Sequence, residues 1–367
     1  MRARGSGLVA LLAVALALSA CAAPLRSQGV SDTAAHHYGI GMKLLETNEP
    51  GRAVEEFERA RALAPGRAPA YEGLGLAALA RKDLDAAESF FKEAKAKESK
   101  YVPAYLGLAR VSSAKGEHDR AKSEAQAAVR LAPRDSRAHL TLGEVLLRAF
   151  DFTRAEASFA KALELDPNSV QARREWDRSV KIRQAAPGTI VGKRIALADP
   201  VTRGELAALL ATELNVESQL RRRRPELFDA SFRPPGAPAA PVPAAPTDVS
   251  AHWAKNAIEL VTRLNLMDLY PDRSFRPDEP VTRATLATTL EQVLSVAAND
   301  PAIKTRYVGQ QSPFPDMRGD HFAYNAAVVV TTRGLMESER PSGAFRLTRP
   351  VSGPEALLAV RKLAELF

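Results

Sequence analysis

Small and apolar residues recur at a fixed spacing along the first half of the chain. Successive members of each series lie 34 residues apart, and the most apolar series is Phe57, Phe91, Ala125 and Phe159. Other series with this step are Ala53, Ala87, Ala121 and Ala155, then Gly41, Gly75, Ala109 and Gly143, then Pro65, Ser99, Pro133 and Pro167. Small residues let helices pack closely and proline ends a helix, so the pattern predicts a mainly α fold of stacked helix pairs.

This 34-residue period resembles the tetratricopeptide repeat family, with four copies over residues 34–168. The resemblance implies an α-solenoid whose groove, lined by the first helix of each pair, holds a protein or peptide. By register, the groove residues are Tyr38, Met42, Glu72, Leu76, Leu106, Arg110, Leu140, Glu144 and Arg148. The alternative is a rigid spacer without a ligand. Residues 169–189 are expected to form a polar helix that caps the array or serves the next module as its first helix.

A second pattern lies between Asp248 and Leu290. Apolar residues at nearly helical spacing predict a short amphipathic helix, and they are Trp253, Ile258, Val261 and Leu264. Asp248 and Ser250 stand where an N-cap is expected. A loop rich in Asp, Arg and Pro follows, and a second helix begins at Val281-Thr282-Arg283. Such a unit is too small to fold alone, so the pattern predicts further copies.

Two further copies are present. Residues 316–323 repeat the Asp-x-x-x-His-Trp-Ala pattern with Phe in place of Trp, and Val201-Thr202-Arg203 repeats the start of the second helix. Over residues 190–367 this pattern resembles the S-layer homology family, usually three tandem modules in a small helical cluster. We assign a partial first module to 190–218, a middle module to 247–299 and a last module to 312–367. Residues 219–246, basic and then rich in Pro and Ala, are expected to be a linker.

The resemblance implies that these modules bind cell-wall polymer or peptidoglycan. The positions that match the family pattern are Asp248, His252, Trp253, Thr282 and Arg283, then Thr202, Arg203 and Glu205, then Asp316, His321, Phe322 and Glu355. Arg203 and Arg283 are the preferred ligand candidates, because a guanidinium can bind a carboxylate with two hydrogen bonds. Alternatively, Trp253 and Phe322 are core residues, and Asp248 and Asp316 are helix caps. Gly353 stands where the family has Arg, so three equal sites are not expected.

The N-terminus has the features of an export signal. Basic Arg2 and Arg4 precede an apolar run over residues 8–18, which is too short to span a bilayer. Leu18-Ser19-Ala20-Cys21 resembles the bacterial lipobox, and Cys21 is the single cysteine of the chain. We therefore expect a signal peptide over 1–20, lipidation of Cys21 and a tether over 21–33. By the sorting rule of the lipoproteins that it resembles, the absence of Asp after Cys21 implies an outer membrane location facing the periplasm in an organism with two membranes.

The charge of the chain and its remaining motifs exclude several classes of function. The formal net charge is +8, but export argues against nucleic acid as the partner of the basic stretch. No motif for catalysis, a metal or a cofactor is found. The sequence therefore predicts a non-catalytic envelope lipoprotein that tethers or scaffolds, with cell-wall polymer and a protein as partners. The alternatives are an assembly factor for a secretion, pilus or outer-membrane complex, and an accessory subunit of a wall-remodelling enzyme.

Overall fold

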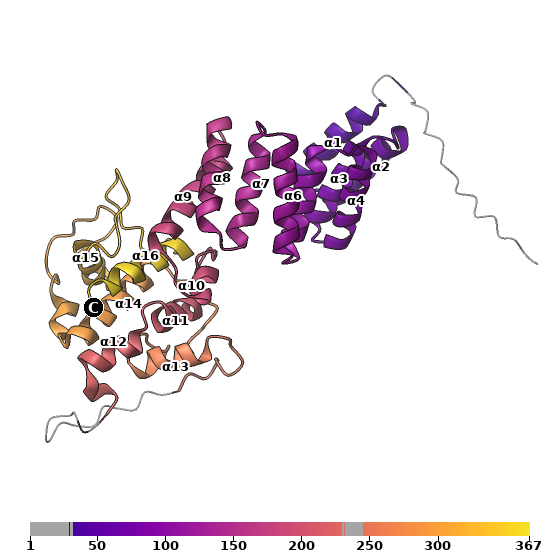
Figure 1. Ribbon diagram of the computed structural model, residues 1–367. Helices are drawn as coiled ribbons and strands as arrows, with labels where there is room; N and C mark the ends of the chain where they lie inside the picture. Colours follow the sequence, from indigo (N-terminus) through magenta and orange to yellow (C-terminus); the bar gives the residue numbers. More distant parts are fainter. Residues whose placement is uncertain (1–28, 30–31, 230, 232–244) are drawn as a thin grey trace, which may run out of the picture. The chain divides into compact units, whose positions relative to one another are not determined.

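The computed structural model describes residues 29, 32–229, 231 and 245–367. These residues form α-helices and short 3-10 helices, and no β-strand occurs among them, so the mainly α prediction is confirmed (Figure 1). The chain divides into two compact units, Met1–Glu117 and His118–Phe367. The predicted signal peptide and Cys21 lie outside the described residues, as does most of the Pro/Ala-rich segment.

The first unit consists of paired antiparallel helices. Helices of 13 and 14 residues alternate, as α1 (Ala34–Glu46), α2 (Pro50–Leu63), α3 (Ala68–Ala80), α4 (Leu84–Lys97) and α5 (Val102–Ala114). Side chains cap two of these helices: Thr33 Oγ1 accepts a hydrogen bond from the backbone N–H of His36, and Asp83 Oδ1 accepts one from that of Ala86. The regular alternation of lengths produces the 34-residue period of the sequence.

Phenylalanine rings join neighbouring helix pairs. Phe57 of α2 is fully buried, and its ring lies against Gly41 of α1 and Gly73 of α3. A Cβ atom at Gly41 or Gly73 would lie 2.5 Å or 2.3 Å from the ring. Those contacts are too short, so glycine is required for the ring to sit between the two helices. Phe91 repeats the arrangement one period later.

The second unit begins with the last helices of the repeat region. They are α6 (His118–Leu131), α7 (Ser136–Arg148), α8 (Phe152–Leu165) and the longer α9 (Val170–Ala185). Ser169 caps α9 by accepting a hydrogen bond from the backbone N–H of Ala172 over 3.2 Å. A helix is thus found where a capping helix was predicted. It packs against α8 on one side and against α16 of the last module on the other.

The C-terminal modules follow in the same unit. Their elements are α10 (Ile190–Ile195), α11 (Arg203–Thr212), α12 (Val216–Arg223), η1 (Pro225–Leu227), α13 (Lys255–Arg263), α14 (Arg283–Ala298), η3 (Pro301–Thr305), α15 (Tyr324–Thr332) and α16 (Gly353–Ala364). Each long second helix packs against the leading helix of the next module, since α11 contacts α13 and α14 contacts α15. The third such contact is between α16 and α9, so α9 takes the place of a leading helix for the first module.

Three valines close the modules into a ring. The backbone N–H of Val281 donates to the carbonyl of Val201 over 2.8 Å, and that of Val351 donates to Val281 over 2.9 Å. The N–H of Val201 donates to Val351 over 2.8 Å and completes the cycle. All three side chains are fully buried. The modules therefore meet around a pseudo-threefold centre, and each valine precedes the N-cap of a second helix.

Two local predictions were wrong. Helix α13 begins at Lys255 with Ala254 as its N-cap and without a side-chain cap, so neither Asp248 nor Ser250 caps it. Trp253 lies before the helix and not on its apolar face. The linker expected over 219–246 also begins inside a helix, because α12 extends to Arg223 and buries Leu220.

Candidate functional site

The candidate site is built from the residues that follow the valine ring. Thr202 and Thr282 cap α11 and α14, each accepting a hydrogen bond from a backbone N–H in the first turn. The capping geometry makes Arg203 and Arg283 the first residues of their helices. Each arginine side chain then enters the loop of the following module.

Arg283 is held by three acceptors. Its Nε donates to the carbonyl of Phe345 and its Nη2 to that of Glu337, each over 2.6 Å, while Nη1 forms an ion pair with Glu355. Only 4% of the residue is exposed. Burial lowers the pKa of Arg283 from its usual value, and the Glu355 carboxylate opposes that change. The guanidinium thus fixes the loop of the last module and positions Glu355.

Arg203 makes the equivalent contacts one module earlier. Its Nε donates to the carbonyl of Phe275 and its Nη2 to that of Asp268, each over 2.8 Å. The residue is 9% exposed, and burial lowers the pKa of its guanidinium. The aromatic ring of Tyr270 lies 5.1 Å from the guanidinium carbon. Both arginines therefore donate hydrogen bonds to backbone carbonyls, which the sequence did not predict.

Gly353 occupies the third equivalent position for a steric reason. Its backbone N–H donates to the carbonyl of Ala198 over 2.8 Å. A Cβ atom there would lie only 1.8 Å from the carbonyl oxygen of Ile195. The chain of the first module approaches α16 too closely for any side chain. The close approach thus explains why a glycine stands here in place of a third arginine.

Asp248 and Asp316 hold the loops that receive the arginines. Asp248 accepts hydrogen bonds from the backbone N–H groups of Phe275 and Arg276, over 2.8 Å and 2.7 Å. Asp316 accepts equivalent bonds from Phe345 and Arg346 at the same distances. These bonds fix each loop so that the carbonyl of its phenylalanine can accept from the arginine. The carboxylates act on a loop rather than on a helix terminus.

The electrostatics of Asp316 fit this role. Burial opposes ionisation of its carboxyl group, but the N–H groups of Phe345 and Arg346 outweigh that effect and lower its pKa. The ionised form is therefore the one that holds the loop. Arg346 has a positive φ of 58°, and Arg276 in the other loop has one of 54°, so both loops have the same turn.

Two exposed aromatic pairs stand apart from these loops. Trp253 is 62% exposed and Phe322 is 81% exposed, so neither is a core residue. Each stacks on the preceding histidine, with ring centroids 5.6 Å apart for His252 and 4.6 Å apart for His321. Each histidine Nδ1 accepts a hydrogen bond from the backbone two residues later, over 3.2 Å. Neither aromatic residue lines the clefts described next.

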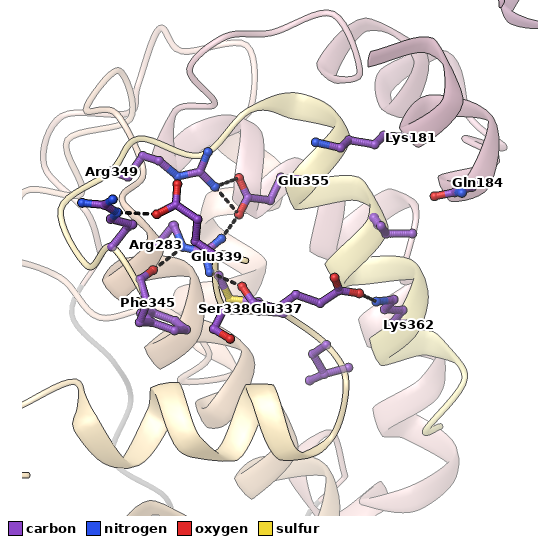
Figure 2. Close-up of a pocket in the computed structure, with 14 residues that line it drawn as sticks. Lys181, Gln184, Arg283, Glu337, Ser338, Glu339, Phe345, Arg349, Glu355 and Lys362 are labelled. Carbon is purple, nitrogen blue, oxygen red and sulfur yellow. Dashed lines mark hydrogen bonds and ion pairs between the residues drawn. The ribbon is translucent and has the colours of Figure 1, made fainter. Parts of the chain in front are cut away.

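A cleft of about 330 Å³ opens above Arg283 (Figure 2). We call it the Arg283 cleft, and it is lined by Lys181, Gln184, Arg283, Leu335, Met336, Glu337, Ser338, Glu339, Phe345, Arg346, Arg349, Glu355, Leu358 and Lys362. Arg349 forms two hydrogen bonds with the carboxylate of Glu355, over 3.0 Å and 2.9 Å. The lining therefore combines charged side chains with the apolar side chains of Leu335, Met336, Phe345 and Leu358.

A second cleft of about 320 Å³ lies at the equivalent place one module earlier. We call it the Arg203 cleft, and it is lined by Arg203, Leu266, Met267, Asp268, Thr285, Thr288, Thr289, Glu291, Gln292 and Lys304. Here Thr285 replaces the glutamate of the other cleft, and Gln292 replaces Lys362. Burial raises the pKa of Glu291, which accepts a hydrogen bond from Asn325. The two clefts are similar in volume but differ in their charged residues.

The repeat residues of the first unit form a separate site. Glu72 is buried, and its Oε2 accepts hydrogen bonds from the hydroxyls of Tyr38 and Tyr101, over 2.8 Å and 2.7 Å. Burial and the charge of Glu72 raise the pKa of Tyr101. Beside this network is an apolar pocket of about 310 Å³, lined by Ala34, Ala35, Tyr38, Ala60, Ala64, Arg67, Pro69, Ala70 and Tyr101.

The other predicted groove residues differ in exposure. In the first unit Met42, Leu76 and Arg110 are half-buried, and Leu106 is buried. In the second unit Leu140 is buried, Arg148 is exposed, and Glu144 accepts a hydrogen bond from Gln171 over 2.8 Å. Glu144 is thus engaged by the capping helix.

Sequence reasoning missed several of these residues. Lys181, Arg349 and Lys362 line the Arg283 cleft, and Tyr101 completes the network on Glu72. The only available signal was the repeated loop pattern, which marks Arg349 by its place just before the last valine of the ring. Lys181 carries no such signal, because α9 precedes the last module by a long stretch of chain.

Two further properties concern the part of the chain that the structure describes. None of its helices combines the length and apolar character needed to cross a bilayer. Its His, Cys, Asp and Glu side chains nowhere gather in a group that could hold a metal ion.

Two protein-family models match parts of the chain. A tetratricopeptide repeat model matches residues 38–101 and 106–170, and an S-layer homology domain model matches residues 247–287. Cell surface glycoprotein 1 of Acetivibrio thermocellus is 30% identical over 116 residues, which are 31% of this chain and 5% of that protein. The cellulosome-anchoring protein of the same organism is 28% identical over 118 residues, 31% of this chain and 24% of that protein. This chain therefore spans less than a quarter of the length of either relative.

Solved structures resemble the repeat region. A thermophilic TPR protein of Thermus thermophilus has a TM-score of 0.38 and 23% identity, covering 40% of this chain and 81% of that chain. The MamA protein of Desulfovibrio magneticus RS-1 has a TM-score of 0.34 and 18% identity, covering 41% of this chain and 85% of that chain.

Proposed function

We infer that this protein is a scaffold that joins the cell wall to a protein partner. The chain contains tetratricopeptide repeats and a C-terminal S-layer homology domain. The S-layer homology domain indicates anchoring in the cell envelope, and the repeats indicate protein–protein interaction. Both families are scaffold or anchoring modules. Our finer proposal is that the Arg283 cleft binds an acidic polymer of the wall, such as peptidoglycan or a polymer attached to it.

The charge arrangement of the Arg283 cleft carries this proposal. Arg349 and Lys362 stand at its edge, with carboxylates that orient their side chains, over the apolar floor of Leu335 and Phe345. Arginine can bind a sugar carboxylate with two parallel hydrogen bonds. Arg283 itself would support the cleft from below, because its donors already bond to Phe345, Glu337 and Glu355.

A sedimentation assay tests the wall proposal. We expect the full chain to pellet with purified peptidoglycan sacculi, and Arg349→Ala with Lys362→Ala to weaken that binding. Arg318→Ala is the matched control, since Arg318 belongs to the same module, is highly exposed and does not line the cleft. If the double variant pellets as well as the control, the polymer does not bind in this cleft.

We further propose that Cys21 is lipidated and holds the protein at the outer membrane, facing the periplasm. The motif Leu18-Ser19-Ala20-Cys21 and the lack of any other cysteine support this proposal. Metabolic labelling with an alkyne fatty acid would test it. Label should appear on the wild-type chain and be absent from Cys21→Ser, and density-gradient fractions of a two-membrane host would locate the labelled protein.

A protein-assembly function is the second candidate, supported by the apolar pocket of the first unit. Tyr38, Tyr101 and the surrounding alanines form a surface that an apolar side chain of a partner could fill. Ala35→Trp would fill this pocket, and Ala96→Trp, on the exposed side of α4, is the control. The full chain would be cross-linked to its partner and the cross-linked partner recovered. We expect Ala35→Trp, and not Ala96→Trp, to reduce the amount of partner recovered. Equal recovery with both variants would exclude this pocket.

A further inference from the structure

We propose that α9, the last helix of the repeat region, is one wall of the Arg283 cleft, and that Lys181 contributes a charge-specific contact to an acidic polymer bound there. This inference rests on the proposed function and goes further, because it assigns part of the polymer site to the repeat region. Neither family model that matches the chain includes Lys181, since one ends at residue 170 and the other begins at residue 247.

The position of α9 supports this assignment. It packs against α16 as α13 packs against α11 and α15 against α14. Lys181 and Gln184 lie one turn apart on its exposed face, and both line the cleft. Figure 2 shows the Lys181 side chain extending from its helix toward the side on which Arg349 and Glu355 lie. Buried Ile182 and Ala185 fix the rotation of the helix that directs Lys181 this way.

Charge pairing distinguishes Lys181 from the other cations of the cleft. Arg283 and Arg349 pair with Glu355, Arg346 pairs with Glu339, and Lys362 lies 3.6 Å from Glu337. Lys181 has no hydrogen bond or ion pair within the described residues. Its ammonium group is therefore available to a ligand without loss of an internal ion pair. An anionic group of a ligand is the partner that this arrangement fits.

The other cleft also has a lysine in its lining. Lys304 of η3 lines the Arg203 cleft and comes from the element that precedes the next leading helix, α15. Both clefts thus combine an arginine at the base with a lysine supplied from outside the module whose loop forms the cleft.

Binding of the full chain to polygalacturonate, a carboxylate-bearing polysaccharide, and to sacculi would test the inference. We expect Lys181→Gln to weaken both interactions by roughly twofold to fivefold, as for one exposed ion pair. Lys181→Glu should weaken them further, and rising salt should reduce the difference. Neutral dextran should bind neither variant nor the wild type. Arg173→Glu is the matched control, because it makes the same charge change on an exposed position of the same helix.

The outcomes separate this inference from the proposed function. If Arg349→Ala weakens binding and Lys181→Glu behaves like Arg173→Glu, the cleft binds polymer without α9, and the inference is wrong. If the wild-type chain binds neither polygalacturonate nor sacculi, the proposed wall function fails, and the inference fails with it. Circular dichroism of each variant should be unchanged, since residues 173 and 181 are both exposed.

Discussion

The Nε atom of Arg283 donates a hydrogen bond over 2.6 Å to the carbonyl of Phe345, which lies 62 residues later in the next module. The same relationship joins Arg203 to Phe275 over 2.8 Å. In both pairs the acceptor loop is held by an aspartate of its own module. Arginine therefore acts here as a connection between modules, and any ligand contact is made around it.

Replacing Arg283 should destabilise the C-terminal modules. Arg283→Ala would leave two carbonyls and the Glu355 carboxylate without their partner, and we expect a loss of about 2–4 kcal/mol in the free energy of unfolding. Arg283→Lys should recover only part, because an ammonium group cannot reproduce the planar fork. Urea unfolding followed by circular dichroism measures both. Arg346→Ala, at a more exposed position, is the control, and an equal loss there would contradict this account.

Asp316 should make the last module sensitive to acid. Its pKa is lower when folded than when unfolded, so its contribution is fully present above the ordinary pKa of about 4 and is lost as the pH falls through the lower folded value. Asp316→Asn should cost about 1 kcal/mol at neutral pH, a modest figure because the residue is exposed.

The pH dependence gives the discriminating measurement for Asp316. The stability difference between wild type and Asp316→Asn should persist down to the ordinary carboxyl pKa of about 4 and shrink as the pH falls below it, through the lower folded pKa. Asp320→Asn, four residues later and exposed, should show no such difference. A difference that persists in acid would mean that the carboxylate charge does not hold the loop.

Gly353 should tolerate no side chain. A Cβ atom there would lie 1.8 Å from the carbonyl oxygen of Ile195, so Gly353→Ala must displace the backbone and should cost about 3 kcal/mol or more. Gly188→Ala is a matched control in the same unit, because its nearest neighbour would be 3.8 Å away. Thermal unfolding would compare the two. Equal melting temperatures would show that the close approach to Ile195 is not maintained in solution.

His37 should make the first unit more stable at slightly acidic pH. Hydrogen bonds to Glu56 and Asp32 raise the pKa of its imidazole, with the Glu56 bond as the largest cause. A raised folded pKa gives stability that is full below the ordinary value of about 6.5 and is lost as the pH rises through the folded value. Arg59 also pairs with Asp32 and keeps its charge throughout.

His37→Gln should therefore remove a stability difference of about 0.5–1 kcal/mol between pH 5.5 and pH 8.5, the size expected of a partly exposed ion pair. Hydrogen exchange of amides in α1 and α2 would report on this unit alone. His36→Gln is the control, since His36 is exposed on the same helix. If both variants keep the pH dependence of the wild type, another group is responsible.

The repeat fold and the module copies could be predicted from the sequence because their determinants are local. Phe57 and Gly41 recur at fixed spacing, and Thr282 directly precedes the helix that it caps. Contacts distant along the chain could not be predicted. Asp248 resembled a helix cap, but the N–H group of Phe275 that it holds lies 27 residues later.

The location of the clefts could not be predicted either, because it depends on contacts between residues distant along the chain. Arg283 is a ligand candidate from the sequence, but its sequence neighbours do not indicate that its Nε and Nη2 donors are taken by backbone carbonyls. Lys181 and α16 meet only because the valine ring brings the last module back to the first. Trp253 seemed to belong to an apolar helix face, but the helix begins two residues after it and leaves the ring exposed.

The valine ring also has a mechanical consequence. Val201 is hydrogen-bonded to both Val281 and Val351, and α9 packs directly on α16. A pulling force that enters through α9 can therefore reach the middle and last modules across these bonds. The covalent segment between Phe228 and Asp248 need not bear tension. The load is shared, because each valine is hydrogen-bonded to both of the others, and loss of one such bond leaves the three modules connected through the remaining two.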